Sequence, residues 1–241
     1  MRKRLRPSNM GAIQSLLLTS ALLAGAAARA QDVGGVLDLN GIGIYGMEDA
    51  VMEAARGPSK KAPAPKAAPV RLTYIPSMAR RKQNYAAFVA KTRTKDPKAA
   101  DDLQKLFSST DVIALAGQKM APLGLRTDNV ADAYALWWVA SYSAANGKEI
   151  PMDRSVLAAV KAQTAKVFGS VKGTAKLTDT TRQQVAEACV LHAVLIDSAM
   201  ERAKGKPDEL KAVATAVRQG ALATGIDLDA LKLTPKGFVA K

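Results

Sequence analysis

The chain has 241 residues, of which 48% are hydrophobic, 23% are charged and 5% are aromatic, and its formal net charge is +14. The single cysteine, Cys189, excludes an internal disulfide, so the fold must be held together by its hydrophobic core. Basic residues are interspersed with acidic ones and aromatic residues are sparse, so we expect a solvated surface and no nucleic-acid partner.

Residues 1–30 have the three-part layout of a secretory signal peptide. A basic start, MRKRLRPSN, precedes an apolar run over residues 11–28 and a small-residue site that ends at Ala30. We expect cleavage between Ala30 and Gln31, and a mature bacterial protein that is periplasmic or secreted. The alternative is an uncleaved membrane anchor, which the polar residues within the apolar run disfavour. No later stretch is apolar enough to span a bilayer, so no transmembrane segment is expected after cleavage.

Three segments follow the signal peptide. Residues 31–56 form a Gly-rich segment, expected to be flexible, that turns helical at MEDAVMEAAR. Residues 57–69, GPSKKAPAPKAAP, have the composition of an extended Pro/Lys/Ala linker. Residues 70–241 have a globular composition and are numerous enough for one domain. Without the five basic residues of the signal peptide, 30 basic and 21 acidic residues remain, a net charge of +9.

The segment NGIGIYGMEDA contains the G-x-G-x-x-G pattern of a dinucleotide-binding turn at Gly41, Gly43 and Gly46. Such a site needs a strand before the glycines and a second parallel strand about 20 residues later. The Pro/Lys/Ala linker lies where that second strand should be, so we expect no nucleotide and no other cofactor. A turn-rich N-terminus is the simpler interpretation. The alternative is a docking segment that uses Val36, Leu37, Ile42, Ile44 and Tyr45.

Residues 70–241 predict an all-α fold, a single bundle of about seven helices. Ser77 is a good N-cap for the first helix, MARRKQNYAAFVAKT. Its apolar face consists of Tyr85, Phe88 and Val89. The basic residues expected to face solvent are Arg80, Arg81 and Lys82.

The later helices follow from caps, breakers and apolar residues at helical spacing. They are expected from Asp96–Pro97, over about 110–120, from Asp128 to Asn146–Gly147, after Asp153, from 178–181 to Lys204–Gly205, and over about 207–224. The run AEACVLHAVLIDSAM is apolar nearly all round, which predicts the buried axis of the bundle. The short pieces RLTY (71–74) and LKLT (231–234) are candidates for a minor two-stranded β ribbon with each other.

Few residues suggest chemistry. Cys189 and His192 lie three apart on an apolar helix face, which raises a thiol pKa, so we interpret both as core residues. No C-x-x-C or H-E-x-x-H pattern is present, so no metal site is expected. Asp128 and Asp132 lie four apart at a helix start, where acids interact favourably with exposed amides and Asp128 is a good N-cap. The alternative interpretation is general acid–base catalysis by this pair of carboxylates.

The aromatic stretch RTDNVADAYALWWVASYSAANG (126–147) is the strongest local signal. Adjacent tryptophans point about 100° apart on a helix, so only one of Trp137 and Trp138 is expected at the centre of a buried stripe. Core packing is the favoured role for this stretch. The alternative is a small-ligand or glycan pocket. Its candidate contact residues are Arg126, Asn129, Asp132, Tyr134 and Trp138.

The succession LTYIPS, RRKQN, FVAKTR, LFSSTDVI, MAPLGLRTDNVADAYALWW and AVRQGALATGIDLDALKLT resembles a family of exported bacterial proteins catalogued only as a domain of unknown function. The resemblance covers about residues 71–239, and its specific part is residues 120–138. It implies an all-helical fold and export, and it brings no catalytic or binding residues.

These observations favour an exported, non-enzymatic binding module that uses the aromatic helix and its entry. The first alternative is a binder of anionic envelope polymers. It would use the basic residues Arg80, Arg81, Lys82, Lys91, Arg93, Lys95 and Lys98. The second alternative is a hydrolase with an unrecognised carboxylate site at Asp132. The partner remains unknown, with an envelope component or a small ligand as candidates.

Overall fold

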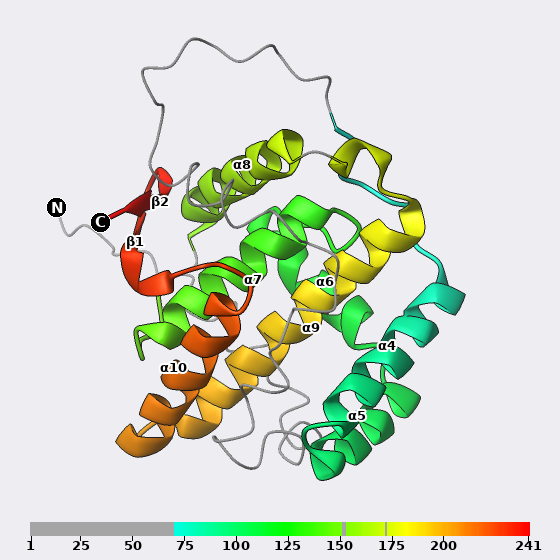
Figure 1. Ribbon diagram of the computed structural model, residues 1–241, viewed down its shortest axis with the longest axis horizontal. Coiled ribbons are helices and arrows are strands. Elements are labelled where there is room, and N and C mark those ends of the chain that lie inside the picture. Colours follow the sequence, from blue (N-terminus) through cyan, green and yellow to red (C-terminus); the bar gives the residue numbers. More distant parts are fainter. Residues whose placement is uncertain (1–69, 151–152, 172) are drawn as a thin grey trace, which may run out of the picture.

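The computed structural model describes residues 70–150, 153–171 and 173–241, which form seven α-helices and one β-hairpin (Figure 1). The helices are α4 (Met78–Arg93), α5 (Pro97–Ser109), α6 (Val112–Met120), α7 (Val130–Ala145), α8 (Arg154–Ser170), α9 (Asp179–Ala203) and α10 (Pro207–Leu222). The strands are β1 (Leu231–Thr234) and β2 (Gly237–Ala240). This confirms the all-α bundle. The signal peptide, the Ala30–Gln31 site, the Gly41 motif and the linker lie outside the described residues.

Local side-chain caps begin most of the helices. Ser77, Asp96, Asp153 and Thr178 each accept a hydrogen bond from a backbone N–H in the first turn that follows. The predicted start of the fourth helix at Asp128 is wrong by two residues, because Asn129 takes the capping role. The Asn129 side chain accepts from the amides of residues 131 and 132.

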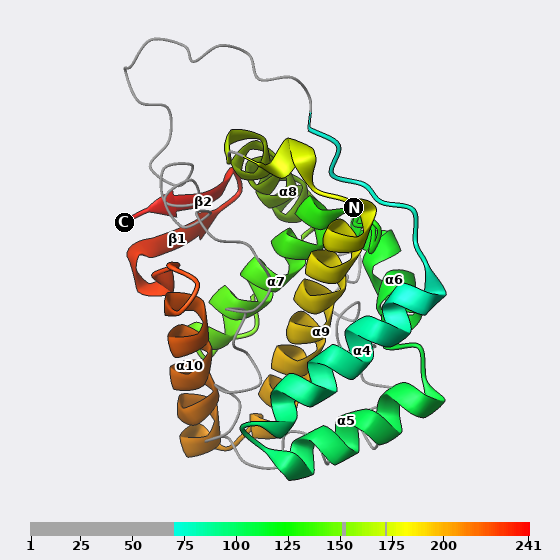
Figure 2. The ribbon, with the colours of Figure 1, turned by 45° about the vertical axis from the view of Figure 1, so that its right-hand side comes forward.

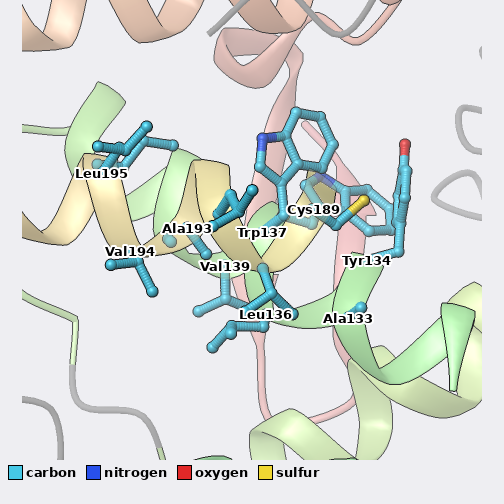
Figure 3. Close-up of a cluster of buried hydrophobic side chains, with 14 of the residues drawn as sticks. Ala133, Tyr134, Leu136, Trp137, Val139, Cys189, Ala193, Val194 and Leu195 are labelled. Carbon is cyan, nitrogen blue, oxygen red and sulfur yellow. The ribbon is translucent and has the colours of Figure 1, made fainter. Parts of the chain in front are cut away.

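Helices α7 and α9 form the centre of the core. Every residue of α7 except Ser143 is buried, and α9 lies between α7 and α4 (Figure 2). Figure 3 shows the Cys189 side chain beside the rings of Tyr134 and Trp137. The buried axis predicted for α9 is therefore confirmed, and α7 shares it. Trp137 and Trp138 are both buried because α7 is covered all round, so the second tryptophan also packs against neighbouring elements.

The predicted ribbon exists with different partners. Strand β1 pairs with β2 in an antiparallel hairpin with Leu231 opposite Ala240, and not with residues 71–74. Thr73 instead forms an isolated bridge with Asn129 at the start of α7. A hairpin needs one short turn, whereas pairing across 160 residues must close a long loop, so the local partner has the lower entropic cost.

The hairpin contacts two helices, α7 and α8. The ring of Phe238 stacks on Trp138 of α7 with centroids 4.2 Å apart. On α8, the Gln163 amide donates to the Phe238 carbonyl over 2.8 Å and accepts from its N–H over 2.9 Å. The hairpin thereby covers one end of the α7–α8 contact, on the side of the molecule away from α4 and α5 (Figure 1).

None of the helices in the described ranges has the length and apolar content needed to cross a bilayer.

Candidate functional site

A groove runs between α4 and α5, which lie side by side at the edge of the bundle (Figure 2). Its volume is about 560 Å³, and it is open to solvent. The apolar floor consists of Tyr85, Ala86, Val89, Ala90 and Phe107. The polar rim consists of Lys82, Arg93, Thr94, Gln104 and Ser108. We call this hollow the α4–α5 groove.

The floor of the α4–α5 groove is rigid because its aromatic residues are fixed by a ring stack and by hydrogen bonds. The rings of Tyr85 and Phe107 stack with centroids 4.3 Å apart. The Tyr85 hydroxyl donates to Asp111 Oδ1 over 3.0 Å and accepts from the Ile113 amide over 3.1 Å. Two hydrogen bonds and a stacked neighbour fix this ring in one position, so an apolar ligand meets a preformed surface.

The charge along the rim is positive. Lys82 and Arg93 lie on the same α4 face, eleven positions and about 16 Å apart. Arg93 donates to Asp101 over 2.6 Å and to Gln104 over 3.0 Å. Both partners of the Arg93–Asp101 pair are solvent-exposed, so the pair contributes little and Arg93 can exchange it for another anion. Among the described residues that line the groove there is no carboxylate.

A buried polar network holds α4 in place behind the groove. Arg81, expected to face solvent, is only 8% exposed and donates to Glu187 of α9 over 2.9 Å. It also donates to Asp111 over 2.7 Å. The expectation for Arg81 is therefore wrong, because an acid on a helix far along the chain offers it a buried partner. Asn84 and Gln183 donate to the remaining Glu187 lone pairs, so the network is satisfied.

In the described structure the candidate contact residues of the aromatic stretch do not line the α4–α5 groove. Tyr134 and Trp138 are buried in the core, where Tyr134 meets Phe168 edge to face. Arg126 is exposed and forms an ion pair with Asp128 over 2.6 Å. Asn129 is the cap. The ligand-contact role of these residues stays a prediction.

Asp132 is the member of that set whose carboxylate is fully buried. It is fully buried, and its Oδ2 accepts from the Arg126 amide over 2.9 Å and from Lys161 over 2.8 Å. Its Oδ1 has no hydrogen-bond partner among the described residues. Burial raises the pKa of the carboxyl, and the Lys161 ammonium partly offsets that rise. The hydrolase alternative, which needs this carboxylate, stays a prediction that Asp132→Asn would test.

Cys189 and His192 are core residues, as expected. Both are buried, and the His192 ring lies 5.2 Å from that of Phe88. Burial raises the pKa of the Cys189 thiol to about 12, so the thiolate is absent at neutral pH. Within the described ranges, no group of three or more His, Cys, Asp or Glu side chains is arranged to hold a metal ion.

Sequence reasoning placed Lys82 and Arg93 on a basic surface but missed the groove between them. A usable signal was present: small alanines at positions 86 and 90 follow Lys82 at four-residue spacing, and Arg93 closes the same face. Small side chains flanked by cations leave room for a ligand. What the sequence does not reveal is that α5 packs beside this face without filling it.

One comparison with known proteins finds a match. A family model described as "Family of unknown function (DUF6683)" matches residues 39–241. The match begins upstream of residue 71 and therefore includes part of the Gly-rich segment and the whole linker. Comparisons with curated proteins and with solved structures find no match.

Proposed function

The chain belongs to the DUF6683 family of unknown function, and we propose that it is an exported, non-enzymatic binding module whose α4–α5 groove holds a ligand with an apolar body and an anionic group. One observation carries this proposal: a rigid apolar floor lies between two cations, with no carboxylate in the lining. Burial of apolar surface away from water supplies affinity, and the cationic side chains of Lys82 and Arg93 favour a ligand with a negative charge.

The dimensions of the groove suit this role. Its volume of about 560 Å³ lies within the range of roughly 300–1,000 Å³ that ligand sites occupy. The hydroxyl groups of the lining are already engaged: that of Tyr85 donates to Asp111, and those of Thr94 and Ser108 donate to the backbone carbonyls of Lys91 and Lys105. The set therefore supports binding better than bond cleavage.

The binding of 1-anilinonaphthalene-8-sulfonate, an aromatic sulfonate, tests the groove. Lys82→Glu combined with Arg93→Glu should weaken its fluorescence-detected binding to the mature chain by at least about tenfold, because two attractive charges become repulsive. Ala90→Trp should also weaken it by filling the floor. The matched control is Lys211→Glu with Lys232→Glu, two exposed lysines on α10 and β1. Equal affinities for the groove variants and the control would refute the site.

Binding of anionic envelope polymers is the second candidate function. Of the basic residues proposed for this role, Arg81 is buried and cannot contact a polymer. Lys82 and Arg93 line the groove, and Lys95 and Lys98 are exposed nearby. A polymer that contacts several of these cations would bind with an affinity that falls steeply as salt rises, since counterions are released. A weak dependence on salt would favour the small amphiphile.

Export is the second half of the proposal. It rests on the basic, apolar and small-residue layout of residues 1–30. Protein recovered from the periplasm or the medium should have the mass of a chain that begins at Gln31. Recovery of the intact chain from the membrane fraction would instead support the uncleaved anchor.

A further inference from the structure

The chain carries, ahead of its domain, a segment whose chemistry complements the groove. Residues 47–56 read MEDAVMEAAR and contain three acids and one arginine. At helical spacing, Met47, Val51 and Ala54 share one face, and Glu48 flanks it. An amphipathic helix that lays such a face into an apolar groove is a recurrent mode of recognition, with anchors at i, i+4 and i+7.

The charges of the two parts are opposite. The lining of the α4–α5 groove contains two cations and no acid, while residues 47–56 have a net charge of −2. The linker over residues 57–69 contains three lysines and no acid, so it offers the groove no competing anion. Attraction therefore favours the acidic segment over the linker that joins it to the domain.

The extended linker is longer than the helix that carries the groove. Its 13 residues include four prolines and, at about 3.1 Å per residue, extend to about 40 Å. Helix α4, which carries the groove, is 16 residues and about 24 Å long. Because the segment is tethered, its effective concentration near the groove reaches the millimolar range, so weak contacts suffice.

The extent of the family match supports a shared role for the two parts. The family model begins at residue 39 and runs to residue 241, so it includes the acidic segment, the linker and the domain as one unit.

We infer that residues 47–56 dock into the α4–α5 groove of the same chain and act as its internal ligand. This inference rests on the proposed binding function of the groove. The apolar face of Met47, Val51 and Ala54 covers the floor, and Glu48, which flanks that face, lies toward the cations of the rim. An external ligand must then displace the segment.

Disulfide trapping in the mature chain tests the contact. Val51→Cys with Ala90→Cys should form an intramolecular disulfide under mild oxidation, seen as a mobility shift without reductant. Val51→Cys with Lys211→Cys, which places the second thiol on α10, should not. The native Cys189 does not interfere because its thiol is buried. Equal cross-linking of the two pairs would overturn the inference.

Binding of 1-anilinonaphthalene-8-sulfonate separates this inference from the proposed function. Met47→Asp with Val51→Asp should tighten binding by about tenfold, the effect of releasing a groove that is free in one molecule in ten. Val33→Asp with Gly35→Asp, outside the segment and outside the candidate docking residues, should leave it unchanged. If the Lys82/Arg93 variant loses binding but the Met47/Val51 variant matches its control, docking is wrong and the groove function stands. If the Lys82/Arg93 variant binds normally, the groove function is wrong, whatever the cross-linking shows.

Discussion

The guanidinium of Arg81 on α4 lies 2.9 Å from the Glu187 carboxylate on α9, and the Glu187 side chain is fully buried. Such a pair costs desolvation energy when it forms, and that cost is offset only when every polar atom finds a partner. Here Asn84 and Gln183 complete the shell of Glu187, and Asp111 binds the other side of Arg81. The pair therefore fixes the position of α4, and with it one wall of the α4–α5 groove.

Removal of one partner of this pair should destabilise the domain strongly. Arg81→Met leaves the Glu187 charge buried without its cation, and we expect a loss of about 3–5 kcal/mol in the free energy of unfolding, measured with urea. Arg93→Met breaks an exposed pair and should cost less than about 1 kcal/mol. The double variant Arg81→Met/Glu187→Leu should regain much of the loss. A double variant no more stable than Arg81→Met would contradict this account.

Gly237 should tolerate no side chain. Its φ is +99°, and an added Cβ would lie 2.8 Å from Gln163 Oε1, the atom that accepts from the Phe238 amide. Gly237→Ala should therefore lower the free energy of unfolding by about 1–3 kcal/mol. Gly169→Ala in α8 meets nothing within 4 Å and should raise it by about 0.5–1 kcal/mol. Equal effects in thermal unfolding would show that the hairpin turn is not strained by a side chain.

Asp197 on α9 should make the domain less stable as pH rises. Burial, with Glu201 and Glu149 nearby, raises the pKa of its carboxyl to about 7. Between about pH 4 and pH 7 the unfolded chain loses this proton while the folded chain keeps it, so the free energy of unfolding falls across that window. Asp197→Asn should equal the wild type near pH 4 and exceed it by roughly 1–3 kcal/mol above pH 7.

Glu201→Gln provides the control for the Asp197 prediction. It removes one neighbouring charge that raises the Asp197 pKa in the folded protein, so the upper end of the pH window should move down while the lower end stays in place. Lys204 forms ion pairs with both Glu149 and Glu201 and partly neutralises their charges. The change in the Asp197 pKa should therefore be modest. If urea unfolding of Asp197→Asn and the wild type shows the same pH dependence, the carboxyl is not buried as described.

The Cys189 thiol should be inert in the folded protein. It is buried beside α7 and its pKa is raised to about 12, so it can react with an aromatic disulfide reagent only after local or global opening. In concentrated guanidinium the reagent should release one equivalent of chromophore. Ser108→Cys, placed on the groove rim, should react at once in the native protein. Rapid reaction of the wild type under native conditions would mean that the α7–α9 contact opens readily.

Local signals made most of the helices predictable from the sequence. Ser77, Asp96 and Thr178 mark helix starts because a cap acts on amides two or three residues away, within reach of sequence reasoning. The unusual apolar content of α9 similarly identifies the buried axis. Even here, Asn129 and Asp128 are neighbours of similar capping propensity, so the sequence does not decide between them, and in the structure Asn129 is the cap.

Non-local partners explain what the sequence did not reveal. The burial of Arg81 depends on Glu187, which is 106 positions away along the chain. The groove likewise arises from the way α5 packs beside α4. In the sequence, its polar lining residues resemble ordinary surface residues and its apolar lining residues resemble ordinary core residues. The stacking of Trp138 on Phe238 of the hairpin is likewise a contact between distant residues that the sequence does not reveal.

The stacking of Trp138 on Phe238 joins residues a hundred positions apart, whereas α4 and α5 are neighbours in the chain. Contacts between close neighbours form early, because little chain must be ordered before they are made, and distant ones form late. During refolding, helical circular dichroism should therefore recover before the tryptophan emission that reports this ring pair. We therefore expect the hairpin to be placed last, and a chain that has not yet placed it to expose the Trp138 ring to water.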